Sequence, residues 1–593
     1  MGPAISLNDY APSPQITVLD TGGQYTHLIA RKVRELGVYA EVRTSETPAA
    51  QLAGRKGIII SGGPASVYEP GSPTIDPAIL HYGIPMLGIC YGQQLMAYLL
   101  DGTVEKGSKG EYGSAVLTLG NIASPLLKGL LQTEPVWMSH RDTVFKAPSN
   151  FDVLASTPTC KIAAIGNDAQ LQYGVQFHPE VAHTRAGKTL LENFVFGICG
   201  CQQDWEPRHR IPVVEEKIRE TAGQRKIFFF VSGGVDSTVA YTLCLRALGH
   251  DRVHGAYVDT GLMREGETEF VKNVFAELGA TAFRVEDARD FFVDKLQGVT
   301  EPELKRKIIG EAFVEIQDRV LNSGHYMDQD WILGQGTIYP DTIESGGTAK
   351  ADLIKTHHNR VEGIQKLMEA GRIVEPLSSF YKDEVREIGR ELGLPAEFLE
   401  RHPFPGPGLA IRCLCSDMDA PVTRIPEGWV VPVHSVGVQG DSRSYRPVLA
   451  VESLEHESAT ELINQLATVN RVIGLIGSLV PMAELSVRRS GLTKERLDRL
   501  RNVDAIVRRL SLAADFEREV WQFPIVLIPL GTAERPDAVV LRPIFSVDGM
   551  TASSVPLPAA LQDQLKSELL AVDGISAVFH DLTHKPPATI EWE

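Results

Sequence analysis

The residues Ser232-Gly233-Gly234-Val235-Asp236-Ser237 could hold an anion between a strand and a helix. The apolar run Lys226–Val231 before them predicts a strand, and residues 238–248 after them predict a helix. The glycines let the backbone curl close to an anion, and the N–H groups of the turn and of the helix N-terminus direct positive partial charge at it. The hydroxyls of Ser232, Ser237 and Thr238 add donors, and the Gly-Lys-Ser/Thr ending of a P-loop is absent. The segment predicts a phosphate cradle, although a glycine-rich turn in any α/β domain could look similar.

A cysteine upstream has the surroundings of a catalytic nucleophile. Residues 85–89 predict a buried strand and residues 93–100 a helix, with Gly88-Ile89-Cys90-Tyr91-Gly92 between them. Such a sharp turn lifts a nucleophile out of the sheet and aims backbone N–H groups at a developing oxyanion. A lone cysteine is usually an inert core residue, so this one needs a base. His178 could take the thiol proton and Glu180 could orient the imidazole, because residues two apart on a strand share a face.

Cys90, His178 and Glu180 together resemble the catalytic triad of class I glutamine amidotransferases. The segment Ile58-Ile59-Ile60-Ser61-Gly62-Gly63-Pro64 also fits that family. The resemblance implies that the N–H groups of Gly63 and Tyr91 form the oxyanion hole and that Gln94 and Ser139 surround the glutamine. Arg141 stands where that family usually has glycine.

The phosphate cradle resembles the signature of N-type ATP pyrophosphatases, which split ATP between the α and β phosphates. A predicted strand at residues 254–258 ends at Asp259, and ligands of parallel sheets bind at the carboxyl ends of strands. The ATP-binding residues expected on these grounds are Ser232, Gly233, Gly234, Val235, Asp236, Ser237, Thr238, Val258, Asp259 and Lys382. ATP chemistry implies Mg²⁺, for which Asp236 is the nominated carboxylate, and no organic cofactor is expected.

Over about residues 15–593 the chain resembles the family of glutamine-hydrolysing GMP synthetases, in the longer form with a duplicated C-terminal unit. The diagnostic segments are residues 305–310, 334–345, 355–359, 382–386, 402–409, 436–445 and 585–593. The resemblance implies that xanthosine monophosphate (XMP) binds at Arg306, Asp441, Arg443, Gln522, Lys585 and Glu591. Without it, the proline-rich tail would predict a disordered end. The cluster Lys305-Arg306-Lys307 would otherwise predict a solvated helix face.

The family resemblance implies a C–N ligase of purine nucleotide biosynthesis. Glutamine would be hydrolysed to ammonia, ATP would adenylate XMP with release of pyrophosphate, and ammonia would displace AMP to give GMP. Two alternatives stay open. Another amidotransferase with the same core, such as an NAD synthetase or a tRNA-modifying ligase, would use a different acceptor. A catalytically inactive regulatory protein would not need Cys90, His178, Glu180 and Asp236, all of which are present.

The predicted fold class is α/β with four parts. Residues 15–204 predict a doubly wound amidotransferase domain, and residues 205–412 a Rossmann-like ATP pyrophosphatase domain. Residues 425–535 and 536–593 predict two α+β repeats, each a strand followed by a helix, near residues 457–474 in the first and 557–570 in the second. Residues 202–212 predict a polar linker, and residues 350–375 a lid over ATP. The internal duplication favours a monomer over a homodimer.

Composition agrees with a large enzyme of a reducing compartment. The chain has 593 residues, a net charge of −17, an apolar fraction of 43% and seven cysteines without a regular framework. The acidic balance argues against nucleic acid as a partner, and no apolar run predicts a membrane span or a signal peptide. Zinc is not expected at the pairs Cys199/Cys201 and Cys413/Cys415. We expect small-molecule substrates, no membrane and a cytoplasmic location.

Overall fold

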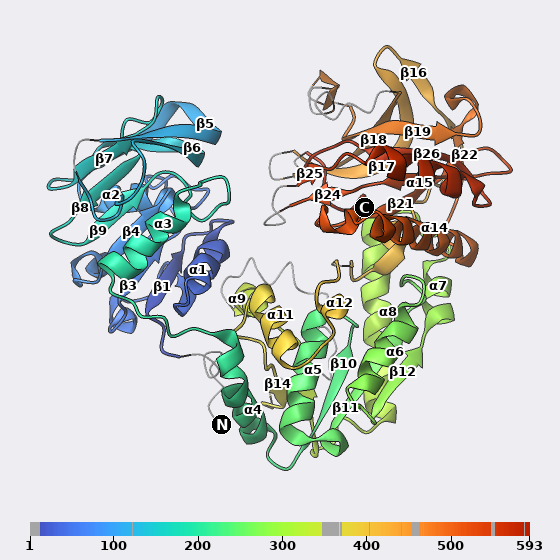
Figure 1. Cartoon of the computed structure of the whole chain (residues 1–593), viewed down its shortest axis with the longest axis horizontal. Coiled ribbons are helices and arrows are strands. Elements are labelled where there is room, and N and C mark those ends of the chain that lie inside the picture. The colour runs from blue at the N-terminus through green and yellow to red at the C-terminus, as the bar shows by residue number, and fades with distance from the viewer. Residues whose placement is uncertain are drawn as a thin grey trace. The chain divides into compact units, whose positions relative to one another are not determined.

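The computed structural model divides the chain into two compact units (Figure 1). The first comprises Met1–Lys217, Thr337–Asp352 and Pro376–Glu391, and the second Ile218–Gly336, Leu353–Glu375 and Leu392–Glu593. The boundaries of these two units differ from those of the four predicted domains. The division into four domains remains a prediction. The structure describes residues 12–593 except 121–122, 347–366, 368–369, 403, 440–441, 453–458, 460–461, 464, 467, 547–551 and 586. Most of the predicted lid, and Asp441, therefore lie outside the described residues.

The first unit is built on a nine-stranded sheet in the order β2-β1-β3-β4-β9-β8-β7-β5-β6. Its first five strands are parallel and the others antiparallel. The short parallel strands β3 and β4 are buried along their whole length, which explains their continuous apolar sequences. This sheet, with helices packed around it (Figure 1), confirms the predicted amidotransferase fold. The elements are β1 (Ile16–Asp20), α1 (Thr26–Glu35), β2 (Ala40–Thr44), β3 (Gly57–Ile60), β4 (Met86–Ile89), α2 (Tyr91–Leu99), β5 (Thr103–Leu119), β6 (Thr133–Lys146), β7 (Asp152–Ser156), β8 (Ala164–Asn167), β9 (Gln172–Val175) and α3 (Gly187–Glu192).

Two later helices, α9 (Tyr339–Gly346) and α11 (Lys382–Glu391), also belong to the first unit. They are held there by Arg34 of α1, which is buried and donates to Glu384 at 3.2 Å and to the carbonyl of Ser379 at 2.8 Å. Burial opposes the charge of Arg34, but Glu384 outweighs it and the pKa of the guanidinium is raised. Four aromatic rings surround this guanidinium at 4.5–5.0 Å from their centroids, namely Tyr39, Trp205, Tyr339 and Tyr381.

The predicted polar linker at residues 202–212 is wrong in part. Trp205 is buried against Tyr39, with ring centroids 4.7 Å apart, and its indole N–H donates to Glu384. The short helix η4 (Pro207–Arg210) then leads directly into α4 (Ile211–Ala222). Because the sequence around Trp205 is polar, it did not indicate that this tryptophan is buried.

The second unit contains a five-stranded, wholly parallel sheet in the order β12-β11-β10-β13-β14. The chain runs outward from β10 through β11 to β12 and then returns to the other side of β10 as β13. The point of return is a topological switch, where α/β sheets bind ligands. Its elements are β10 (Lys226–Val231), α5 (Val235–Leu248), β11 (Val253–Asp259), α6 (Glu267–Glu277), β12 (Phe283–Asp287), α7 (Arg289–Leu296), α8 (Pro302–Ser323), β13 (Trp331–Gly334) and β14 (Ile373–Val374).

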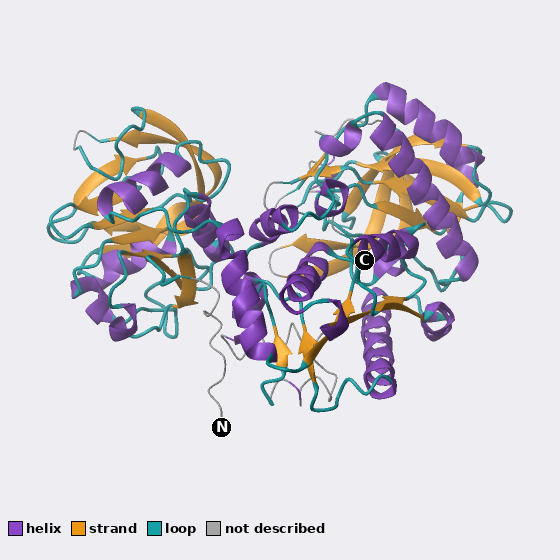
Figure 2. Cartoon of the chain, turned by 60° about the horizontal axis from the view of Figure 1, so that its bottom comes forward, coloured by secondary structure: helices purple, strands orange, loops and turns teal. Residues whose placement is uncertain are grey.

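The C-terminal part of this unit has a seven-stranded sheet in the order β16-β17-β18-β19-β26-β23-β21. Both predicted repeats contribute strands to this one sheet, and the internal duplication is not confirmed. The helix expected near 457–474 is wrong at its end, because Arg471 begins a strand. Helices flank the strands in both units (Figure 2). The elements are α12 (Ala396–Leu399), β16 (Thr423–Ile425), β17 (Gly428–Gln439), β18 (Ser442–Val451), β19 (Arg471–Ser478), α14 (Lys494–Ala513), β21 (Ile525–Ile528), β23 (Asp537–Leu541), α15 (Ala559–Ala571) and β26 (Ile575–Asp581), with short strands β15 (Ala420–Pro421), β20 (Ser486–Val487), β22 (Leu530–Gly531), β24 (Ile544–Phe545) and β25 (Ser553–Ser554).

The C-terminal tail is ordered by buried charges. Trp592 is fully buried and donates to Asp581 at 2.9 Å. Lys305 of α8 is also fully buried, with its Nζ 2.9 and 2.8 Å from the two carboxylate oxygens of Glu593. Burial disfavours the charge of Lys305, but Glu593 outweighs it and raises the lysine pKa. The solvated-face prediction is therefore wrong for Lys305 and correct for Lys307, whose side chain is 60% exposed.

Glu593→Gln should destabilise the second unit by about 3 kcal/mol, because it leaves the Lys305 ammonium without its buried counter-charge. Hydrogen exchange of amides in α8 and β26 would measure the loss. The double variant Lys305→Met/Glu593→Gln should recover much of it, and Lys307→Met should have no measurable effect. Equal protection in the single and wild-type proteins would contradict this account of the tail.

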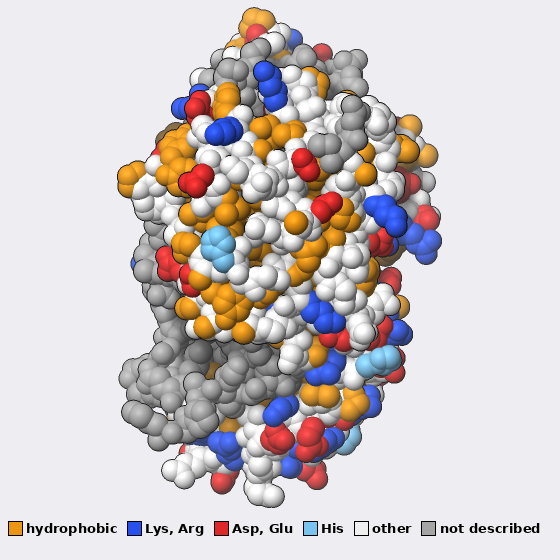
Figure 3. Space-filling model, turned by 90° about the vertical axis from the view of Figure 1, so that its left-hand side faces the viewer, with side chains coloured by type: hydrophobic (Ala, Val, Ile, Leu, Met, Phe, Trp, Pro, Cys, Tyr) orange, Lys and Arg blue, Asp and Glu red, His pale blue; other side chains and the backbone are white. Residues whose placement is uncertain are grey.

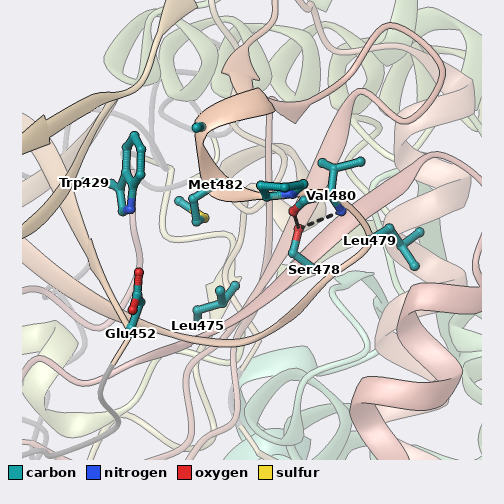
Figure 4. Close-up of a pocket in the computed structure, with 9 residues that line it drawn as sticks. Trp429, Glu452, Leu475, Ser478, Leu479, Val480 and Met482 are labelled. Atoms are coloured by element: carbon teal, nitrogen blue, oxygen red, sulfur yellow. Dashed lines mark hydrogen bonds between the residues drawn. The ribbon is translucent and has the colours of Figure 1, made fainter.

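Acidic, basic and apolar side chains are interspersed over the face shown in Figure 3. Among the described residues, no helix is both long enough and apolar enough to cross a membrane. A hollow of about 560 Å³ in the C-terminal part is lined by Trp429, Leu475, Met482 and their neighbours (Figure 4). It contains none of the predicted site residues.

Candidate active sites

Cys90 stands at a strained turn between β4 and α2, with φ 52° and ψ −106°. This conformation is unfavourable for a residue with a side chain, and it persists where the surroundings impose it. A Cβ added at Gly88 would come within 2.5 Å of the backbone of Gly92, and one at Gly92 within 2.3 Å of the carbonyl oxygen of Ile60. Both glycines are therefore needed for the turn to close. This turn, residues 88–92, is called the elbow below, and it has the geometry that its sequence predicts.

Three neighbouring parallel strands bring the candidate triad together. Cys90 follows β4, Gly62 follows β3, and His178 follows β9 by three residues. A Cβ built on Gly62 would lie 3.2 Å from His178 Cε1 and 3.6 Å from Cys90 Cβ. The imidazole and the thiol therefore share one small space at the carboxyl edge of the sheet.

Glu180 holds the imidazole of His178. Its Oε1 lies 2.7 Å from His178 Nδ1, and both residues are buried. The prediction that the two lie on a strand is wrong: β9 ends at Val175, and the pair lies in the turn that follows. The turn brings the two side chains together as the strand would have done.

Burial and charge act in opposite directions on His178. Burial disfavours the imidazolium, but Glu180 and Cys90 outweigh it and raise the pKa of His178 from 6.5 to about 10. The ring is therefore protonated at neutral pH, the form that can give a proton to a leaving group. Because the pKa is raised on folding, the stabilisation is complete below about pH 6.5 and is lost as the pH rises toward 10.

Glu180→Gln should lower the pKa of His178, because the neutral amide no longer stabilises the imidazolium. Titration of the imidazole carbon-bound protons by NMR measures that pKa directly. Glutaminase turnover should fall by about 10²-fold, and the loss of stability between pH 6.5 and 10 should become smaller. Glu192→Gln, at a glutamate of α3 that is 42% exposed, is the matched control. An unchanged titration of His178 in the Glu180→Gln protein would show that Glu180 does not set its charge.

The other predicted glutamine-site residues surround Cys90. A Cβ at Gly63 would lie 3.3 Å from the ring of Tyr91, so the two residues predicted to form the oxyanion hole are neighbours. The carbonyl oxygen of Ser139 lies 3.7 Å from Cys90 Sγ. Gln94 is buried and donates to the carbonyl of Asp142 at 2.7 Å. Their individual roles in binding glutamine remain predictions.

Two further residues at this site were not singled out from the sequence. Gln176 Nε2 lies 3.5 Å from Cys90 Sγ, and its Oε1 accepts from Gln94 at 3.1 Å. The ring of Tyr25 meets His178 edge to face, with centroids 5.2 Å apart. Gln176 is only two residues from His178 in the sequence, and this proximity could have indicated that Gln176 lies at the same site.

The phosphate cradle begins where β10 ends. Val235, Asp236 and Ser237 form the first turn of α5, which starts three residues earlier than predicted. Gly233 has φ 75°, a conformation that suits glycine. Ser232 and Ser237 face each other with their hydroxyl oxygens 3.1 Å apart, and Thr238 donates to the carbonyl of Gly234 at 3.0 Å. These bonds shape the turn around the N-terminus of a long helix, as an anion site requires.

The segment after β13 lies close to the backbone of this cradle. A Cβ at Gly336 would lie 2.7 Å from the backbone N and Cα of Ser237. β13 pairs with β10, so Gly336 and the cradle lie at the switch point of the sheet. The motif that begins at Gly334 thus contributes backbone to the predicted ATP site.

Asp259 ends β11 and borders a cavity of about 940 Å³ in the second unit. Asp259 accepts from the N–H of Gly261 at 3.0 Å and from the hydroxyl of Thr268 at 2.9 Å. The basic residues that line the cavity are Arg264, Lys272, Arg289, Lys494 and Arg501. Val258 precedes Asp259 and is buried, and Lys382 begins α11 in the first unit.

The predicted XMP residues that the structure describes lie around the C-terminal tail. Glu591 accepts from buried Arg412 at 3.0 and 2.7 Å, and Arg306 donates to the main-chain oxygen of Glu593. Lys585 pairs with Ala552 through the backbone, and buried Gln522 pairs with Ile544. Arg443 lies in β18. The structure thus brings Arg306 and the tail together, and the binding roles remain predictions.

Comparisons with known proteins agree with two separate sites, one at Cys90 and one at the cradle. Three family models match the chain: glutamine amidotransferase class-I over residues 17–198, NAD synthase over residues 208–308, and GMP synthase C terminal domain over residues 511–592. The first region contains Cys90 and its elbow, and the second contains the cradle.

Several curated proteins are similar over almost the whole chain. A probable glutamine-hydrolyzing GMP synthase of Leptospira interrogans is 43% identical, covering 98% of this chain and 99% of the relative. Glutamine-hydrolyzing GMP synthases of Symbiobacterium thermophilum and Bacillus cereus are 40% and 39% identical, each over 98% of this chain and over 99% and 98% of their own lengths. The chain therefore belongs to the family of glutamine-hydrolysing GMP synthases, whose members are C–N ligases.

Proposed function

We propose that this chain converts XMP to GMP with nitrogen from glutamine and energy from ATP. The observation that carries the proposal is that one chain contains two different reaction centres. Cys90 at its elbow shares a space with the buried His178–Glu180 pair, and the cradle after β10 lies at the switch point of a second parallel sheet. The first can release ammonia and the second can activate an oxygen as a leaving group.

At the first centre the Cys90 thiolate attacks the carboxamide carbon of glutamine. The negative oxygen that forms is held by the N–H groups of Gly63 and Tyr91, and the imidazolium of His178 gives its proton to the departing ammonia. Water then hydrolyses the thioester, with neutral His178 as the base. Glu180 keeps the ring oriented and compensates its charge throughout.

At the second centre the N–H groups of the cradle and of the first turn of α5 hold the phosphates of ATP. The C2 oxygen of XMP attacks the α-phosphorus, and pyrophosphate leaves. Ammonia then adds at C2 and AMP departs, which gives GMP. Arg306 and the tail residues Lys585 and Glu591 are the proposed XMP contacts, together with Gln522, Asp441 and Arg443.

Mg²⁺ is the proposed metal partner of ATP, and the donor set around the cradle fits it. The carboxylate of Asp236 and the hydroxyls of Ser232 and Ser237 are hard oxygen donors, which Mg²⁺ prefers. When bound with ATP, the ion would neutralise charge on the departing pyrophosphate.

The proposed partners are glutamine, ATP and XMP, and the proposed state is a cytoplasmic monomer. All seven cysteines are unpaired with one another, which supports a reducing compartment. Strands from both halves of the C-terminal region form one sheet within a single chain, which supports a synthetase site that needs no second copy.

The test is an acceptor competition. The purified chain is given glutamine, MgATP and an equimolar mixture of XMP, inosine monophosphate and deamido-NAD, and AMP and products are quantified. We expect AMP and GMP in equal amounts, with the other acceptors untouched. Consumption of deamido-NAD with XMP left intact would assign a different acceptor.

A further inference from the structure

A second group of reactive side chains lies in the first unit, apart from the Cys90 triad. Glu111 of β5, His140 of β6 and Cys160 each offer one potential metal ligand, and these three atoms lie within 4.8 Å of one another. His140 and Cys160 are buried, and the side chain of Glu111 is 12% exposed. An imidazole, a thiol and a carboxylate from three separate segments thus converge on one small space.

The hydrogen bonds of His140 show that this space is suited to a cation. His140 Nδ1 lies 2.9 Å from the carbonyl oxygen of Asp142, so it must carry a proton. His140 Nε2 lies 3.0 Å from Oε2 of Glu111, which in its ionised form is also only an acceptor. With Nδ1 as the donor, Nε2 of His140 turns its lone pair toward Oε2 of Glu111, which is how two ligands of one cation face each other.

Each candidate ligand is held by an outer partner. Thr157 and Thr159 donate to the other oxygen of Glu111, at 2.9 Å in the case of Thr157. The hydroxyl of Thr143 lies 3.2 Å from the sulfur of Cys160. The bond from His140 Nδ1–H to a backbone carbonyl is the arrangement that orients most metal-binding histidines.

We propose that Glu111, His140 and Cys160 bind a thiophilic divalent ion of the Zn²⁺ type, with water as the fourth ligand. A nitrogen, a sulfur and a carboxylate oxygen are a three-residue donor set that Zn²⁺ accepts in tetrahedral geometry. Bond lengths of about 2.0–2.3 Å draw the ligand atoms closer together than 4.8 Å, so the side chains must close on the ion. Burial raises the pKa of the Cys160 thiol, so binding releases its proton.

The ion would fix the strand that lines the glutaminase site. His140 lies between Ser139, whose carbonyl oxygen is 3.7 Å from Cys90 Sγ, and Asp142, whose carbonyl accepts from Gln94. An ion that ties β6 to Glu111 and Cys160 holds both carbonyls in place. The proposed site is thus a positioning site beside the glutamine pocket and does not include a triad residue.

The test uses the full chain with Cys90→Ala, which removes the catalytic thiol as a competing ligand. After chelation and dialysis, this protein is titrated with Co²⁺ and then with Zn²⁺. We expect one Co²⁺ per chain with a thiolate-to-cobalt charge-transfer band that Zn²⁺ abolishes. Adding Cys160→Ser should remove the band and weaken binding at least tenfold.

Two matched variants separate metal binding from folding. Glu111→Gln should also weaken binding, yet its amide can donate to neutral His140, so the ion-free fold should be preserved. Cys415→Ser, at a half-buried cysteine of the second unit, should leave the titration unchanged. Absence of binding in the Cys90→Ala chain, or a charge-transfer band that survives Cys160→Ser, would overturn the proposal. Amide hydrogen exchange of β5 and β6, compared between the ion-free variants and the ion-free parent chain, checks that the first unit of every variant is folded.

Discussion

Replacing Cys90 by alanine is expected to abolish GMP formation from glutamine and to leave formation from added ammonium near the wild-type rate. The change removes only the nucleophile, since alanine can occupy the same strained turn at φ 52°. Loss of a covalent nucleophile costs on the order of 10⁴-fold or more in turnover. The cradle after β10 belongs to the other compact unit and retains all its hydrogen bonds.

The measurement is GMP production at saturating XMP and MgATP, first with glutamine and then with ammonium as the sole nitrogen source. Cys199→Ala, at a half-buried cysteine of the same unit, should retain both activities. If Cys90→Ala loses the two activities together while the chain remains folded, Cys90 is not merely the glutaminase nucleophile.

Asp236→Asn is expected to stop AMP formation with either nitrogen source. Asp236 lies in the first turn of α5, within the cradle, and the amide keeps its shape while removing its charge. Without the carboxylate that is proposed to hold Mg²⁺ beside the phosphates, synthesis should fall by at least about 10²-fold. Glutamine hydrolysis at Cys90 should continue, because that centre is built from other strands.

Pyrophosphate and AMP release, measured with glutamine and with ammonium, tests this expectation. Asp251→Asn is the control, since Asp251 is exposed in the short 3₁₀ helix η5 (His250–Arg252). Normal turnover of the Asp236→Asn protein would remove that carboxylate from the ATP site.

Local sequence predicted the parts of both centres that depend on short segments. The strand Lys226–Val231 is observed with its predicted bounds, and the elbow at Cys90 lies between a strand and a helix as expected. Continuous apolar runs bounded by glycines are strong signals because a buried parallel strand and a tight turn each need particular residues. The partners His178 and Glu180 were predicted from their types, although not with the correct backbone.

Interactions between distant segments could not be predicted in the same way. Trp205 and Arg34 lie in polar or charged stretches, and only the fold shows that they pack together with Glu384. Lys305 meets Glu593, which is 288 positions away, and a charged run alone suggests exposure. The group Glu111, His140 and Cys160 joins three segments that share no motif.

We conclude that nitrogen released at Cys90 is joined to an adenylated purine nucleotide by the same chain. The most direct measurement follows the label from glutamine that carries ¹⁵N in its side-chain amide, with XMP and MgATP as the only other substrates. Mass spectrometry should find one ¹⁵N atom in each GMP formed, with one AMP released for each. Glutamate and ammonia without any labelled GMP, while XMP and ATP remain intact, would contradict the claim.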